Sequence, residues 1–153
     1  MLAACNKSEN LTKLDGKVNS ISDCKLQKSL RQTESDSLSY SCVQYSFSSS
    51  NNVLILKHLN AVFNCCPKKI NCDFNLKNDT IFITESETDG NCDCMCLYDI
   101  ETEISGLKPD QYVIKFQEPY LGDQQVIVFL VDLTQQLSGE YCVERTNYPY
   151  PGE

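Results

Sequence analysis

The chain has 153 residues, ten of them cysteines, and it carries 13 Lys and Arg against 21 Asp and Glu. This length favours a single domain with a buried core. The net charge of −8 argues against nucleic acid as a partner, because the chain would not neutralise the phosphates. The longest uninterrupted apolar run, Val126 to Val131, is too short to cross a bilayer as a helix.

The first residues have the pattern of a lipid attachment site. Leu2-Ala3-Ala4-Cys5 resembles the lipobox that ends a bacterial lipoprotein signal peptide. The resemblance implies that residues 1–5 are the remnant of such a signal and that Cys5 carries the lipid, the expected contact with a membrane. Residues 6–36 are polar and are predicted to form a tether, with one helix around Ser22 to Arg31.

From Leu38 onward the sequence predicts short β-strands. β-Branched and aromatic residues dominate segments that are separated by clusters of turn residues. Eight strands are expected, over 38–47, 53–63, 70–76, 80–84, 92–100, 112–117, 125–133 and 140–145. This spacing indicates an all-β fold, an antiparallel sandwich or barrel of about seven or eight strands over residues 37–147. Residues 148–153 are predicted to be an extended tail.

One turn favours the sandwich. Leu107, Pro109 and Tyr112 resemble the Leu-x-Pro-x-x-Tyr corner of fibronectin type III and related immunoglobulin-like domains. The resemblance implies an immunoglobulin-like sandwich in which the Tyr112 hydroxyl bonds back to the backbone of the corner. The alternative is an ordinary Pro-Asp turn before a strand.

The cysteines other than Cys5 are candidates for disulfides. They are Cys24, Cys42, Cys65, Cys66, Cys72, Cys92, Cys94, Cys96 and Cys142. Since nine is an odd number, at least one thiol is free, bound to a metal or paired with another chain. Disulfides at this density indicate an oxidising compartment, and Cys24 is expected to pin the N-terminal segment to the body.

Six cysteines form a cluster whose geometry is informative. In a strand, Cys92, Cys94 and Cys96 point to one face about 6.6 Å apart, so we expect each to find a partner in another segment. The adjacent Cys65 and Cys66 point to opposite faces and are expected to serve different partners. Three upstream cysteines (65, 66, 72) then balance three downstream ones (92, 94, 96), with the connectivity open.

The same cluster allows two alternatives. His58 with Cys66, Cys94 and Cys96 would form a Cys₃His zinc site, although the chain lacks the Cys-x₂-Cys spacing typical of zinc. A thiol-redox site would use Cys65, Cys66, Cys92, Cys94 and Cys96, but no Cys-x-x-Cys motif is present.

Two further expectations concern polar residues. His58 is the only histidine, so any Ser-His-Asp site would have to use it. A hydrogen bond to a neighbour on an edge strand is expected for it instead. The acidic turn from Glu85 to Asn91 is expected to be solvated.

Three segments together resemble small cysteine-rich lipoproteins of Bacteroidetes. They are Leu2 to Cys5, His58 to Pro67 and Cys92 to Asp99, under a fifth of the chain. The resemblance implies an exported, membrane-anchored β-domain of the cell envelope, in the periplasm or on the cell surface, and it implies no reaction. We therefore expect a lipid-anchored, non-enzymatic binding or accessory domain that needs no cofactor and has an unidentified protein or glycan partner. The alternative is a metal-binding protein, with zinc or iron, or a thiol-redox protein that uses the cysteine cluster with His58.

Overall fold

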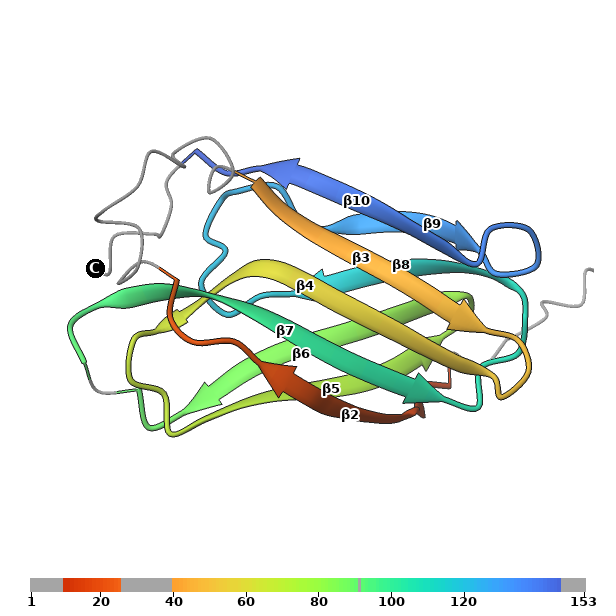
Figure 1. The fold of residues 1–153 in the computed structure, drawn as a ribbon, viewed down its shortest axis with the longest axis horizontal. Coiled ribbons are helices and arrows are strands. Elements are labelled where there is room, and N and C mark those ends of the chain that lie inside the picture. Colours follow the sequence, from red (N-terminus) through yellow and green to blue (C-terminus); the bar gives the residue numbers. More distant parts are fainter. Residues whose placement is uncertain (1–9, 26–39, 91, 147–153) are drawn as a thin grey trace, which may run out of the picture.

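The computed structural model describes residues 10–25, 40–90 and 92–146, which form two five-stranded sheets packed against each other (Figure 1). Sheet A has the order β1-β5-β6-β8-β9, and sheet B has the order β10-β3-β4-β7-β2. The strands are β1 (Thr12–Lys13), β2 (Asp15–Ile21), β3 (Tyr40–Ser48), β4 (Val53–Asn64), β5 (Lys69–Lys77), β6 (Thr80–Thr88), β7 (Met95–Ser105), β8 (Gln111–Gln117), β9 (Val128–Asp132) and β10 (Ser138–Glu144). The predicted all-β architecture is confirmed. None of the described residues belongs to a helix that could cross a bilayer.

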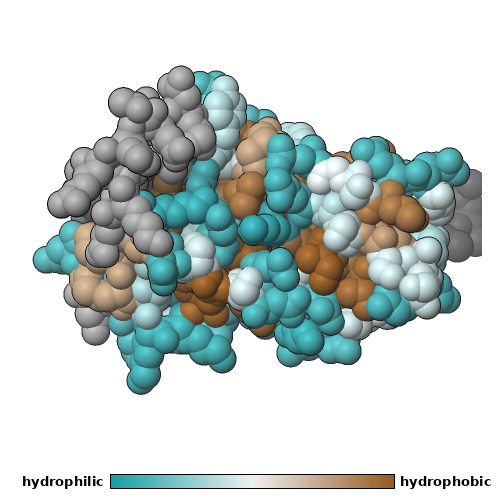
Figure 2. All heavy atoms as spheres, viewed as in Figure 1, coloured by the Kyte–Doolittle hydropathy of each residue, from teal (hydrophilic) through white to brown (hydrophobic). Residues whose placement is uncertain are grey.

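The strands form because their apolar side chains alternate with polar ones. In β4, Leu54, Leu56 and His58 are buried. Lys57, which lies between Leu56 and His58, is only partly buried. Inward residues of both sheets, such as Leu56 of β4 and Ile114 of β8, meet in one apolar core. Figure 2 shows the outer face of sheet B, where hydrophilic side chains separate smaller apolar patches. Each sheet therefore has one buried and one largely polar face.

The sheets are not purely antiparallel. β6 pairs with β8 in parallel, with Ile81 opposite Ile114. Between these two strands the chain crosses to sheet B, runs along β7 and returns to sheet A. Two reversals of direction bring β8 back parallel to β6, which corrects the antiparallel expectation at this one pairing.

The predicted tether was wrong over part of its length. Residues 12–21 form β1 and β2, so the sandwich contains two more strands than predicted and begins well before residue 37. β2 pairs with β7, and Gly16 lies so close to the Phe74 ring that a Cβ there would be only 2.2 Å from it. Ser22 to Lys25 are not helical, and the rest of the predicted helix lies outside the described residues, as do residues 1–5 and the tail 148–153.

The corner before β8 has the predicted hydrogen bond. The Tyr112 hydroxyl donates to the Lys108 carbonyl at 2.9 Å, and Leu107 is buried in the core. This bond ties the start of β8 to the turn that precedes it, as in the tyrosine corners that the motif resembles.

Candidate functional site

Eight cysteines form four disulfides. The pairs are Cys24–Cys96, Cys42–Cys142, Cys65–Cys94 and Cys66–Cys92, with Cα–Cα distances of 5.4, 4.0, 5.5 and 5.9 Å. The downstream cysteines do not pair among themselves, and the adjacent Cys65 and Cys66 take different partners, as predicted. The strand predicted over 92–100 was wrong at its start, because β7 begins at Met95; Cys92 and Cys94 precede it, and Cys65 and Cys66 follow the end of β4. Cys24 pins the N-terminal segment to β7, also as predicted. The fold is thus crosslinked at several points.

Three bridges were expected between the upstream cysteines (65, 66, 72) and the downstream ones (92, 94, 96), and two of them are present. Cys96 bonds to Cys24, and Cys72 is the free thiol within the part of the chain that the structure describes. Cys72 lies in the middle of β5, opposite Glu85 of β6, and packs against the apolar cluster that contains Cys96. Burial, followed by the charges of Glu85 and Asp73, raises the pKa of the Cys72 thiol, so it stays protonated and is a poor nucleophile.

The predicted zinc ligands do not come together. Cys66, Cys94 and Cys96 belong to three separate disulfides, and His58 contacts none of them. The Cys₃His site is therefore wrong. The thiol-redox set is likewise occupied by disulfides, because all five of its cysteines are paired.

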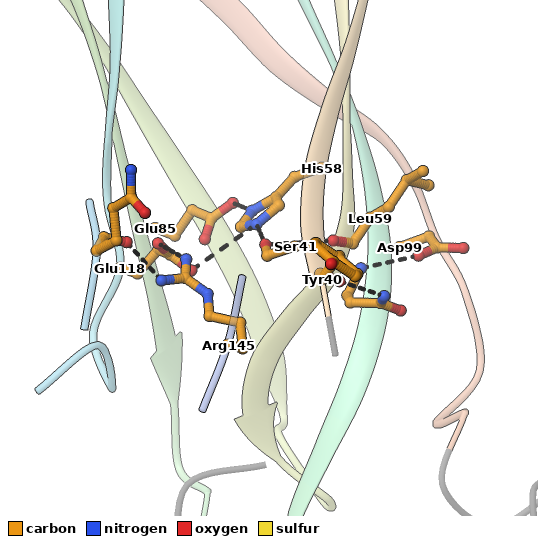
Figure 3. A network of polar contacts seen from close by, with 10 residues as sticks. Tyr40, Ser41, His58, Leu59, Glu85, Asp99, Glu118 and Arg145 are labelled. Carbon is orange, nitrogen blue, oxygen red and sulfur yellow. Dashed lines mark hydrogen bonds and ion pairs between the residues drawn. The ribbon is translucent and has the colours of Figure 1, made fainter. Parts of the chain in front are cut away.

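His58 instead belongs to a buried group of polar side chains, here called the polar layer: Ser41, His58, Glu85, Glu118 and Arg145 (Figure 3). The layer separates two apolar clusters along the strands. On β4, Leu56 belongs to one cluster and Ala61 to the other, with His58 between them. The sandwich interior is therefore apolar, then polar, then apolar along its length.

The imidazole of His58 is held from both sides. His58 Nδ1 lies 2.7 Å from Glu85 Oε1, and Nε2 lies 2.8 Å from Ser41 Oγ. Glu118 Oε1 is 3.8 Å from the same Nε2. On the far side of Glu118, Arg145 Nη2 donates to Oε2 at 2.8 Å, and Nη1 donates to the Gln125 carbonyl.

The charges of the polar layer balance when His58 is protonated. Two carboxylates then face one imidazolium and one guanidinium, as buried charges require. Burial lowers the pKa of His58, but the Glu85 and Glu118 carboxylates outweigh it and raise that pKa overall. Burial also raises the pKa of Glu118, with Glu85 adding to the effect, while His58 and Arg145 oppose it.

A β-bulge follows His58 in β4, and it shifts the inward positions from even-numbered residues such as Leu56 and His58 to odd-numbered ones such as Ala61 and Phe63. Asn60 has a positive φ of 63°, and the pairing with β7 shifts between His58 and Ala61. The Asn60 amide nitrogen donates to Asp99 Oδ1 at 3.1 Å, and its side chain donates to the Tyr40 carbonyl at 2.7 Å. β4 lies between β3 and β7, so the expected edge-strand position of His58 is wrong, although its hydrogen bonds to neighbours are present.

The order Ser41–His58–Glu85 is that of a hydrolase relay, in which a carboxylate orients a histidine beside a serine. The exposed fractions of these residues are 0, 1 and 3%. A relay needs a substrate at the serine oxygen, and this one is enclosed within the sandwich. In the conformation described, these side chains bond to one another inside the sandwich and do not face solvent.

The sequence analysis did not identify Ser41, Glu118 or Arg145 as members of this layer. It also placed Glu85 in a solvated turn, which was wrong. β6 continues to Thr88, so Glu85 follows Ile81 and Ile83 on the inward face. Glu87 is also engaged, because it accepts a hydrogen bond from the Asn64 amide at 3.0 Å. Strict alternation of inward positions, extended beyond the last apolar residue, would have identified Glu85 and also Glu118.

The polar layer predicts that the protein is most stable in mild acid. A raised pKa means that the folded state holds the His58 proton more tightly than the unfolded chain does. The stabilisation that protonated His58 provides is fully present below about pH 6.5, the pKa of histidine in the unfolded chain. It is lost as the pH rises through the pKa of His58 in the folded state. Urea unfolding from about pH 6 to about pH 9 should show a falling free energy, and His58→Gln should flatten this slope. If His58→Gln left the pH dependence of the free energy of unfolding unchanged, that dependence would have to come from other groups.

One surface pocket lies at the disulfide-linked end of the sandwich, with a volume of about 420 Å³. Cys24 and Cys65, Ile70 and Tyr98 contribute to its walls, together with Lys68 and Lys69. The volume is within the range of small-molecule sites. Its lining combines apolar, aromatic and cationic side chains.

The comparisons with known proteins found no match: neither a family model, nor a curated protein, nor a solved structure is similar to this chain. Its function therefore has to follow from its own residues and their geometry.

Proposed function

We propose that the chain is an exported, lipid-anchored binding or accessory domain without enzymatic activity, built as an immunoglobulin-like sandwich. The observation that carries this proposal is the set of four disulfides, which persist in oxidising compartments and are rare in reducing ones. The tyrosine corner supports the immunoglobulin-like assignment, and the resemblance of Leu2 to Cys5 to a lipobox supports the anchor.

The pocket at the disulfide-linked end is the binding site that we assign to this domain. Three disulfides converge on the segments around it, since Cys24 and Cys65 line it and Cys66 follows Cys65. Crosslinked walls keep their shape when no ligand is bound, which reduces the entropy lost on binding. Lys68 and Lys69 in the pocket lining suit a protein loop or a glycan with acidic groups.

The test of the exported scaffold is an intact mass measured before and after reduction, combined with alkylation and elemental analysis. We expect the mass to rise by about two units for each of the four bridges. Metal should be absent, and Cys72 should react only after unfolding. Alkylation of nearly every cysteine in the untreated protein would overturn the proposal. Fatty-acid labelling in the native cell, lost in Cys5→Ser, tests the anchor separately.

Metal binding is a second candidate function, with ligands from the polar layer and not from the cysteines. His58, Glu85 and Glu118 each offer a ligand atom, and these atoms lie within 4.8 Å of one another. Glu85 Oε2 is buried without a hydrogen-bond partner. One histidine and two carboxylates suit zinc. The Arg145 guanidinium already supplies a cation beside Glu118, so the elemental analysis decides: near-stoichiometric zinc that His58→Gln abolishes would favour this function.

A further inference from the structure

The outer face of sheet A gathers exposed apolar side chains. Leu130 and Val128 of β9 are 65% and 42% exposed, and they alternate along the strand with residues of the core. Val113 of β8 lies opposite Leu130 and shares its face. At the other edge of the sheet, Leu11 directly precedes β1 and is 61% exposed. Because Leu14 packs against the core, strand alternation turns Leu11 toward the outer face as well.

The same face is cationic, whereas the outer face of sheet B is acidic. The strands of sheet A carry four lysines and two aspartates at outward positions: Lys13, Lys69, Lys77 and Lys115, with Asp73 and Asp132. The strands of sheet B carry two lysines and six carboxylates there: Lys17 and Lys57, with Asp15, Asp99, Glu101, Glu103, Glu140 and Glu144. A chain with a net charge of −8 therefore presents one face of the opposite sign.

The pairing register brings these apolar and cationic side chains together. Two adjacent rows cross sheet A from β5 to β9: Lys77, Thr80, Val113 and Leu130, then Asn75, Phe82, Lys115 and Val128. Lys115 Nζ lies 6.0 Å from the centroid of the Phe82 ring. A lysine among apolar side chains can cover them with its methylene groups while its ammonium reaches outward. We call this surface the sheet A patch: Leu11, Lys13, Lys77, Phe82, Val113, Lys115, Val128 and Leu130.

We propose that the sheet A patch lies on the surface of a bilayer that contains anionic lipids. This inference rests on the lipid anchor proposed above, and the position of that anchor is the reason for a membrane as the occupant. Six residues separate Cys5 from Thr12, about 25 Å of extended chain, and β1 belongs to sheet A. A lipid on Cys5 would hold the patch beside the headgroups. Anionic lipids would attract its lysines and repel the acidic outer face of sheet B.

A single introduced tryptophan can report on one face, because the chain has none of its own. In a Cys72→Ala background, Cys5 is coupled to a maleimide lipid in phosphatidylcholine vesicles, with phosphatidylglycerol at zero or about 30%. With the anionic lipid present, the emission of Leu130→Trp should shift to shorter wavelength and be quenched by brominated acyl chains. Without it, both effects should weaken. Gln44→Trp, at an exposed outward position of sheet B, is the matched control and should show neither effect.

The role of charge is tested in the same vesicles. Lys115→Gln should lower the ratio of membrane-bound to free patch about fivefold, because one lysine near an anionic surface contributes roughly that factor. Lys57→Gln removes the same charge from the outer face of sheet B and should leave the ratio unchanged. Equal quenching of the two tryptophans, or equal effects of the two lysines, would overturn the proposal. So would a shift of the Leu130→Trp emission without quenching by bromine, which would mean that protein and not lipid covers the patch.

The design separates this proposal from the anchor on which it rests. The maleimide lipid replaces the natural acyl chain, so the vesicle results do not depend on acylation in the cell. Quenching of Leu130→Trp together with failed fatty-acid labelling would overturn the anchor and support the patch. Successful labelling with an unquenched Leu130→Trp would overturn the patch and leave the anchor in place.

Discussion

Replacing Cys42 and Cys142 with alanine is expected to lower the free energy of unfolding by about 4–5 kcal/mol. The two residues face each other on β3 and β10 and join positions 100 residues apart. Without the bridge, the unfolded chain gains the conformational freedom of this long loop. Urea denaturation gives the free energy directly, and the melting temperature should fall by about 10–20 °C.

The matched control removes the bridge between Cys66 and Cys92 while Cys65–Cys94 remains. These two bridges join the same short segments, so the first already closes most of the loop that the second would close. The cost of removing Cys66–Cys92 should be no more than about 2 kcal/mol. Equal costs for the two removals would show that loop closure does not explain how the bridges stabilise this fold.

Arg145→Met is expected to lower the free energy of unfolding by about 3–5 kcal/mol. The side chain is fully buried and pairs with Glu118, so its removal leaves an under-compensated carboxylate beside His58. Glu118→Met in the same chain should restore part of the loss, because it removes the unpaired charge. Equilibrium unfolding of the single and double variants measures this coupling.

The control for Arg145 is Lys17→Met. Lys17 pairs with Glu103 across β2 and β7, but the lysine side chain is largely exposed, so its removal should cost about 1 kcal/mol or less. If Arg145→Met were as mild as Lys17→Met, the polar layer would not be the tightly coupled group that its geometry indicates.

The central strands could be predicted because burial imposes a period of two. β8 was expected over 112–117 and spans Gln111–Gln117, and β4 was expected over 53–63 and spans Val53–Asn64. β2 could not be found in this way, because it is an outer strand whose residues are mostly exposed. Its position depends on pairing with β7 and on the bond from Cys24 to Cys96, neither of which leaves a local pattern.

The polar layer could not be predicted from the sequence for a related reason. Composition predicts that glutamates are solvated, and only partners brought from other strands make Glu85 and Glu118 suitable for the interior. Those partners, such as Arg145, are far away in the sequence. Disulfide pairing was limited in the same way, because the choice of Cys24 for Cys96 depended on tertiary structure.

The early start of β1 has a consequence for how the domain would stand on a bilayer. Six residues separate Cys5 from Thr12, and even a fully extended chain spans only about 25 Å over that interval. β2 then runs from the β1 end toward the pocket, to which Ile21 contributes (Figure 1). With a lipid on Cys5, as proposed, the β1 end of the sandwich would lie within that distance of the headgroups, and the pocket would lie at the opposite end of β5.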